Sequence, residues 1–312
     1  MTKGQRNTRE NKDSHASQCP VCGSKTQCLL KLAACDILSC PQCTHQFADL
    51  APTENHIDEQ YNDRYFKGGG TSGYEDYVAS GSLIRAHGTR YAELMGIHSL
   101  AGRTAGECRL MDIGCAAGFL MSGFKHAGWD VTGIDPNATM VALARSNGFR
   151  AYQGTLETLR DDIRHGSKNQ QYDLISLIQV IAHLTDLERS KESLAALVKD
   201  NGFALIETWN CRSMTARLLG PNWHEYSPPN VMHYFSKPSL DRFMDDAGFS
   251  PTTGGRPSKT ITMGHARSLF RYKYGNTRWG RALLSASRLF KDDFSVPYPS
   301  EDLFWRLYQK RS

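Results

Sequence analysis

Two carboxylates, each near the end of a short apolar run, are the residues of this sequence best placed to do chemistry. Asp112 stands before a turn that contains Gly114 and Gly118, and Asp135 ends a second apolar run that begins at Val131. This is the order of strand, turn, helix and strand by which an open α/β sheet holds an adenosine-containing cofactor. The glycines permit a tight turn and close approach of the backbone to a ligand. We expect Asp135 to accept hydrogen bonds from both hydroxyls of a ribose.

The same turn argues against a dinucleotide. Dinucleotide sites use Gly-x-Gly-x-x-Gly to place backbone N–H groups on a pyrophosphate, whereas Ala116 and Ala117 separate the two glycines here, and Asp112 stands at the mouth of the turn. A carboxylate in this place repels a pyrophosphate and suits a ligand that carries an ammonium and a sulfonium. The segment resembles motif I of the class I S-adenosylmethionine-dependent methyltransferases, with Ala116 in place of the middle glycine. A Rossmann-like strand pair for another ligand is the alternative.

The resemblance implies an α/β fold with a Rossmann-like, doubly wound, seven-stranded sheet. It also implies S-adenosylmethionine as the cofactor, with its adenine near the backbone of Thr155 and Leu156. The cofactor-binding residues that follow are Asp112, Gly114, Cys115, Ala116, Gly118, Phe119, Asp135, Pro136, Thr155, Leu156, Gln179, Tyr65 and Tyr74.

Four cysteines near the N-terminus have the spacing of a metal site. Cys19 and Cys22 form one Cys-x-x-Cys pair, and Cys40 and Cys43 form a second. Each pair can turn two thiolates toward one centre, so together they predict a closed, tetrahedral, structural zinc site. A ribbon this small needs the metal in order to fold. Four free structural cysteines are the alternative.

A connector rich in glycine and tyrosine follows the cysteines. Its Tyr65, Tyr74 and Tyr77 predict a lid, and the alternative is that they only dock the connector on the domain. A cysteine ribbon, this connector and a methyltransferase domain occur together in a large bacterial family, which the chain resembles over residues 18–312. The family's members look like enzymes of polysaccharide, lipid-linked sugar and secondary-metabolite pathways. In this family the connector tyrosines approach the methionine end of the cofactor or the substrate.

Methyl transfer to a hydroxyl needs alignment, exclusion of water and a base. His233 and His183 are the candidate bases, because an imidazole titrates near neutral pH. The alternatives are that His183 only bonds a backbone carbonyl and that His233 only pins its loop. Beyond the fifth strand the chain is rich in aromatic, histidine and proline residues, which predicts a substrate wall. The candidate substrate residues are Tyr77, Trp209, Asn210, Trp223, His224 and Tyr226.

Composition and charge bound the remaining possibilities. The 312 residues suffice for one sizeable core and a small module. The sequence shows neither an apolar run of membrane-spanning length nor a signal peptide, and it has nine cysteines, which together predict a cytoplasmic protein. Residues 251–312 hold 12 Lys and Arg against 4 Asp and Glu, while the first 250 residues hold 25 against 28. Positive charge confined to one region argues against a nucleic-acid partner.

The motifs predict five segments along the chain. They are a disordered tail (1–17), a zinc ribbon (18–50), a helical connector or lid (51–105), a catalytic domain (106–253 with 299–312) and a basic helical insertion (254–298). We expect the last strand to insert antiparallel at the sheet edge. The basic insertion predicts a clamp for a phosphate-bearing or lipid-linked substrate, or a weak peripheral membrane contact. A helical cap with a solvated basic face is the alternative.

The sequence therefore predicts an S-adenosylmethionine-dependent methyltransferase. We expect in-line transfer to an oxygen of a saccharide, lipid-linked sugar or other small metabolite, with a histidine base. C- or N-methylation of a small molecule stays open, as does an RNA- or protein-directed binding module that uses the zinc ribbon. A protein that binds the cofactor without turnover is a further alternative. The acceptor and the oligomeric state are not defined by the sequence.

Overall fold

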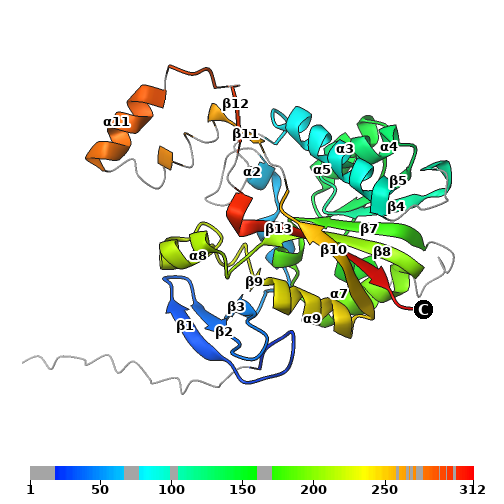
Figure 1. The fold of residues 1–312 in the computed structure, drawn as a ribbon, viewed down its shortest axis with the longest axis horizontal. Coiled ribbons are helices and arrows are strands. Elements are labelled where there is room, and N and C mark those ends of the chain that lie inside the picture. The colour runs from blue at the N-terminus through cyan, green and yellow to red at the C-terminus, as the bar shows by residue number, and fades with distance from the viewer. Residues whose placement is uncertain are drawn as a thin grey trace, which may run out of the picture.

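The computed structural model describes residues 18–66, 77–98, 105–159 and 171–257, and residues 260–312 except 265–266, 268–269, 272–276, 288, 293 and 298–299. The predicted tail at residues 1–17 and Tyr74 therefore lie outside the described residues. A seven-stranded sheet forms the centre of the molecule, with helices on both faces (Figure 1). None of the described helices is long and apolar enough to span a bilayer.

The central sheet has the strand order β10-β13-β8-β7-β4-β5-β6. Five neighbouring strands, from β8 to β6, are parallel, and β13 is antiparallel to both of its neighbours. The order reverses between β4 and β7, which is where open α/β sheets bind their ligands. The strands are β4 (Arg109–Ile113), β5 (Asp130–Asp135), β6 (Arg150–Gln153), β7 (Tyr172–Ile178), β8 (Val198–Trp209), β10 (Phe249–Gly255) and β13 (Leu303–Lys310).

The predicted Rossmann-like, seven-stranded α/β fold is thus confirmed. The last strand is antiparallel as expected, but its placement at the edge is wrong, because β10 pairs along its outer side. β10 contains proline, two threonines and two glycines, without the apolar alternation that marks a strand in a sequence.

Helices cover both faces of this sheet, as Figure 1 shows. One face carries α3 (Gly81–His98), α4 (Phe119–His126) and α5 (Ala138–Ser146), whose buried side chains pack on those of β4 and β8. The other face carries α7 (Leu187–Leu197) and α9 (Lys237–Asp246). Strands buried on both faces are largely apolar, which explains why β4, β5 and β7 are visible in the sequence.

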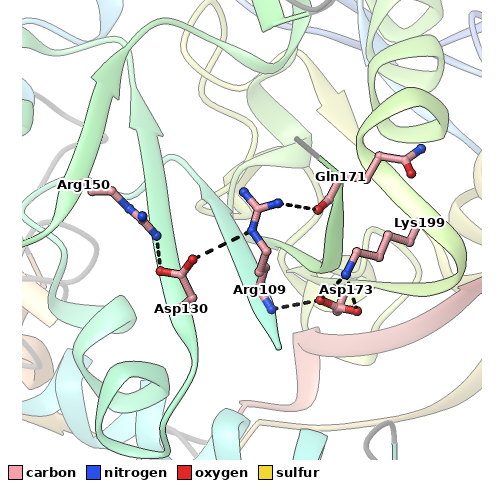
Figure 2. A network of polar contacts seen from close by, with 6 residues as sticks. All are labelled: Arg109, Asp130, Arg150, Gln171, Asp173 and Lys199. Carbon is pink, nitrogen blue, oxygen red and sulfur yellow. Dashed lines mark hydrogen bonds and ion pairs between the residues drawn. The ribbon is translucent and has the colours of Figure 1, made fainter. Parts of the chain in front are cut away.

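A network of ion pairs joins the strands at their amino ends (Figure 2). Lys199 Nζ lies 2.8 Å from Asp173 Oδ2, and the Arg109 backbone N–H donates to the same oxygen at 3.0 Å. Asp130 pairs with both Arg150 and Arg109. Each of these carboxylates therefore has a cationic partner at this edge of the sheet.

A second sheet joins the N-terminal segment to the catalytic domain. Its order is β1-β2-β3-β9, so the ribbon strands continue into a strand that lies about 190 residues further along the chain. The short elements of this region and the connector are β1 (Gln27–Lys31), β2 (Asp36–Ser39), β3 (Gln46–Ala48), β9 (His233–Tyr234), α1 (His56–Gln60), α2 (Asp63–Phe66), η1 (Ala105–Glu107), η2 (Ile181–His183), α8 (Met214–Leu219), η3 (Gly220–Asn222) and η4 (Ser300–Asp302).

The basic segment contains both a helix and a strand pair. Helix α11 (Arg278–Ser287) projects from the body of the molecule, while β11 (Thr260–Thr262) pairs antiparallel with β12 (Ser295–Pro297) (Figure 1). Leu289 beyond the helix is 88% exposed, and Phe290 is 50% exposed. The described part of this segment is therefore not helical alone.

Candidate active site

The turn from β4 into α4 has a backbone that only small residues tolerate. Gly114 and Gly118 have φ angles of +73° and +80°. A Cβ at Gly114 would lie 2.5 Å from Val180 Cγ2, and one at Gly118 would lie 2.6 Å from Phe149 Cδ2. Ala116, which stands where the motif has its middle glycine, also has a positive φ of 43°. This locally strained backbone directs the Ala116 N–H toward a carboxylate.

That carboxylate is Asp135, at the end of β5. Its Oδ2 accepts from the Ala116 N–H at 2.8 Å, and its Oδ1 accepts from the Asn137 N–H at 2.9 Å. Burial raises the pKa of Asp135 to about 6, although the two N–H bonds oppose this rise. Both oxygens keep a further lone pair, so the group can still accept from a ligand diol.

Asp112 lies one strand away and is also buried. Ser176 Oγ donates to its Oδ1 at 2.6 Å, and burial raises the pKa of Asp112 to about 7. Within the described part of the chain, neither Asp112 nor Asp135 has a Lys or Arg partner, in contrast to the amino edge in Figure 2. Buried carboxylates without a cation are costly unless a ligand supplies the positive charge. The pair therefore fits a cofactor that carries an ammonium and a sulfonium.

Gln179, at the end of β7, has a φ of +60° and is held by Glu207 of β8. Its backbone N–H donates to the Glu207 carbonyl at 2.8 Å, and its Nε2 donates to Glu207 Oε1 at 2.8 Å. Tyr91 Oη donates to the other carboxylate oxygen, and His87 Nε2 lies 3.1 Å from it. Glu207, Tyr91 and His87 are not among the predicted site residues, because nothing local in the sequence connects two helix positions with a strand residue more than 110 positions further on.

The connector packs against the glycine turn. Tyr77 stacks on Phe119 with ring centroids 5.4 Å apart, and Tyr65 belongs to the same apolar cluster as the turn. Asn137 Nδ2 donates to the Tyr61 carbonyl at 3.0 Å and so joins the connector to the end of β5. Asn137 and Tyr61 were missed, although an asparagine three residues before Met140 is a recognisable helix N-cap.

The remaining predicted cofactor residues are held by contacts within the chain. The side chains of Cys115, Phe119 and Leu156 are buried in the core clusters. The Thr155 N–H donates to Thr158 Oγ1 at 3.0 Å, and the Pro136 carbonyl accepts from Gln153 Nε2 at 3.1 Å. Their contacts with the cofactor stay predictions.

The two candidate bases differ in their hydrogen bonds. His183 Nδ1 lies 2.9 Å from the Asn230 carbonyl, which can only accept, so Nδ1 carries the proton and Nε2 keeps a lone pair. Burial lowers the pKa of His183. His233 has a hydrogen bond to the backbone of Leu184, its Nδ1 lies 3.3 Å from His45 Nε2, and burial lowers its pKa to about 4. His183 therefore has the protonation state of a base, whereas both nitrogens of His233 are occupied.

The predicted substrate wall forms one aromatic cluster. Trp209 meets His224 edge to face at 4.5 Å, and Trp223 meets Tyr226 at 5.1 Å. Trp223 is buried, and its Nε1 donates to Asp302 Oδ2 at 3.1 Å. The Asn210 N–H donates to the Asp302 carbonyl at 2.6 Å, so Asn210 lies beside the same group. Asp302 ties this cluster to the start of the last strand.

The four cysteines come together as the spacing predicts. All four Sγ atoms lie within 4.8 Å of one another, with 3.6 Å between Cys19 and Cys43 and 3.5 Å between Cys22 and Cys40. A tetrahedral zinc with bonds of about 2.3 Å places its sulfur ligands about 3.8 Å apart. These distances therefore fit one zinc ion and are too long for disulfides.

Comparison with known proteins identifies the family of the chain. A family model described as a methyltransferase domain matches residues 85–253, more than half of the chain. The ubiquinone biosynthesis O-methyltransferase of Rhodopseudomonas palustris (strain HaA2) is 29% identical over 131 residues, which are 41% of this chain and 51% of that protein. The protein of the same name from Bordetella avium (strain 197N) is 29% identical over 174 residues, 53% of this chain and 71% of that protein. The chain thus spans about half the length of the Rhodopseudomonas relatives.

Among solved structures, an S-adenosylmethionine-dependent methyltransferase from Archaeoglobus fulgidus is similar, with a TM-score of 0.48 and 17% identity over 74% of this chain and 95% of that one. The family match covers the glycine turn, Asp135 and the parallel strands that carry them. The chain therefore belongs to the S-adenosylmethionine-dependent methyltransferases of the class I fold.

Proposed function

We propose that this methyltransferase acts on an oxygen of a small acceptor: a saccharide, a lipid-linked sugar or another hydroxylated metabolite. The observation that carries the proposal is the state of His183. Its Nδ1 proton is fixed by the Asn230 carbonyl at 2.9 Å, and its Nε2 lone pair is left to accept a proton. The two relatives described above are named O-methyltransferases, which supports oxygen over carbon or nitrogen.

The proposed roles of the residues follow from their hydrogen bonds. S-adenosylmethionine, when bound, supplies a methyl group on a sulfonium sulfur. Asp135 binds the ribose hydroxyls, and the backbone of the turn at Gly114 and Gly118 approaches the methionine end of the cofactor. His183 Nε2 would take the proton of the acceptor hydroxyl as the methyl group is transferred in line to its oxygen, and His183 would then release this proton to water.

The other parts of the chain have supporting roles in this proposal. Cys19, Cys22, Cys40 and Cys43 hold one structural zinc. The connector predicted over residues 51–105 would cover the site through Tyr65 and Tyr77, which lie in the apolar cluster of the glycine turn. The basic segment 254–298 would bind a phosphate-bearing acceptor or, weakly, a membrane surface. We place the protein in the cytoplasm. The two Cys-x-x-Cys pairs pack against the catalytic domain, which argues against a ribbon that binds RNA on its own.

The test is a panel of hydroxylated acceptors (sugar nucleotides, phenols and catechols) together with amines, with products identified by mass spectrometry. We expect methyl ethers only. The variant His183→Gln should lower kcat about 10²-fold or more with an unchanged S-adenosylmethionine affinity, because only proton transfer is lost. The exposed His126, changed in the same way, is the matched control. N-methylated products, or full activity in His183→Gln, would refute the proposal.

A further inference from the structure

The ribbon and the acceptor side of the catalytic domain share one sheet. β3 pairs antiparallel with β9, with Gln46 opposite Tyr234 and Phe47 opposite His233. β9 has only two residues and lies at the edge of this sheet, so among the described strands β3 is its single neighbour. An isolated strand this short is not stable, and pairing with the ribbon therefore stabilises its extended conformation.

Side chains directly after the second Cys-x-x-Cys pair, Cys40 and Cys43, reinforce this pairing. Thr44 Oγ1 and Ser236 Oγ lie 2.6 Å apart, and Tyr226 Oη donates to Gln46 Oε1 at 2.6 Å. His45, which is fully buried, meets His233 at 3.3 Å. Three consecutive ribbon residues thus each contact the segment that runs from Tyr226 to Ser236.

The two Cys-x-x-Cys pairs of the ribbon face the catalytic domain. The side chains of Cys19, Cys40 and Cys43 are buried in the same apolar cluster as Phe235 and Leu240 of the catalytic domain. By contrast, β1 at the far side of the ribbon is mostly exposed. The metal site therefore faces the catalytic domain, and the outer strand faces solvent.

A chain of backbone hydrogen bonds continues from the ribbon to the proposed base. The Ala48 N–H donates to the Met232 carbonyl at 2.9 Å, and the Met232 N–H donates to the Ala182 carbonyl at 3.0 Å. Ala182 precedes His183, and the Asn230 carbonyl that fixes the His183 tautomer lies two residues before Met232. The segment held by the ribbon is therefore the segment that orients the imidazole.

We propose that the four-cysteine ribbon holds the proposed base in position. Thr44, Gln46 and Ala48 are positioning residues, which orient His183 through the segment 226–236. The role of His183 rests on the proposed function. The metal is accordingly coupled to the acceptor side of the site. The predicted cofactor carboxylates, Asp112 and Asp135, lie on β4 and β5, which pair with no strand of the ribbon sheet.

The first test removes zinc from the full chain with a chelator and measures hydrogen exchange. We expect exchange to become at least tenfold faster in residues 44–48, 181–184 and 226–236, and to stay unchanged in 110–118. S-adenosylmethionine affinity, measured by calorimetry, should change less than about twofold. Restoring zinc should reverse the effect. Unchanged exchange in 181–184 overturns the proposal, as does loss of cofactor affinity together with the metal.

The second test keeps the metal and removes the hydrogen bond between Gln46 of the ribbon and Tyr226 of the catalytic domain. Gln46→Met and Tyr226→Phe each remove one partner of the 2.6 Å bond, and Gln27→Met on the exposed strand β1 is the matched control. Gln46→Met and Tyr226→Phe should each keep one zinc per chain and normal cofactor affinity. Hydrogen exchange in residues 181–184 should become at least threefold faster in both. Combining them should add little, because they remove the same bond. Exchange equal to that of the Gln27→Met control overturns the proposal.

These readouts separate the two levels of inference. A protein that does not bind S-adenosylmethionine contradicts the proposed function, whereas the exchange data still measure the coupling of the ribbon to residues 181–184. A protein that binds the cofactor but shows no such coupling contradicts the support role alone.

Discussion

Affinity for S-adenosylmethionine should fall steeply below neutral pH. Burial raises the pKa of Asp112 to about 7 and that of Asp135 to about 6 in the cofactor-free chain. A cationic cofactor with a ribose diol needs both groups as carboxylates, because a protonated acid neither balances the positive charge nor accepts two hydroxyl bonds. Binding therefore favours the charged forms and releases protons from whichever group is still protonated.

The magnitude follows from the fraction of chains in which both groups are ionised. With pKa values of about 6 and 7, this fraction is roughly 0.7 at pH 7.5 and roughly 0.007 at pH 5.5. Kd should therefore rise about 100-fold between these two pH values. In Asp112→Asn only Asp135 still titrates, and the same pH change should raise Kd about fourfold.

Isothermal calorimetry at several pH values measures both the affinity and the protons released, if two buffers of different ionisation enthalpy are compared. Asp130→Asn is the matched control, since Asp130 is a carboxylate of the opposite edge with cationic partners. This variant should show the wild-type pH dependence. Affinity that is flat from pH 7.5 to 5.5, or that changes equally in wild type and Asp112→Asn, refutes the reasoning.

Four further expectations concern stability, metal, the base and the basic helix. The folded pKa of Asp112 exceeds its unfolded value, so the buried carboxylate costs increasing stability as the pH rises toward 7. Asp112→Asn should therefore raise the unfolding free energy of the cofactor-free protein at pH 8, by at most about 4 kcal/mol. Thermal unfolding should show this as a higher Tm, and a lower Tm contradicts it. Elemental analysis should find one zinc per chain and none in Cys40→Ser, which should also become protease-sensitive near the N-terminus. Burial, with His56 and His233 nearby, lowers the pKa of His183, so kcat should decrease only below pH 6.5. A decrease in kcat that begins above this pH contradicts the base role. Neutralising three arginines together should raise the KM of a phosphate-bearing acceptor without changing cofactor affinity, and the protein should not bind generic RNA; these residues are Arg278, Arg281 and Arg288.

The sequence was sufficient for features whose cause is local. The glycine turn was predictable because Gly114 and Gly118 need backbone angles that few other residues adopt. The four-cysteine cluster was predictable because each Cys-x-x-Cys pair turns two thiolates toward one centre within four residues. The parallel strands β4, β5 and β7 were predictable because strands buried on both faces are largely apolar.

Features that depend on distant contacts were not predictable in this way. Glu207 looks like an ordinary strand residue until Tyr91 and His87 of α3 meet its carboxylate. The pairing of β3 with β9 joins segments 186 or more residues apart, and His233 reads as a free imidazole until His45 lies against it. In each case the sequence supplies the chemical group, and only the fold supplies its partner.

The two edges of the central sheet show how the same residue type acquires opposite roles. At the amino edge, Asp130 and Asp173 are neutralised by arginine and lysine, and the network fixes neighbouring strands to one another (Figure 2). At the carboxyl ends of the strands, Asp112 and Asp135 are buried without a Lys or Arg partner among the described residues, and this burial raises the pKa of both carboxyl groups at a cost in stability. A cation placed beside Asp112 would remove that cost and stabilise the empty protein. It would also compensate the charge that a sulfonium cofactor needs, so we expect this end of the sheet to lose stability in the empty protein in exchange for cofactor affinity.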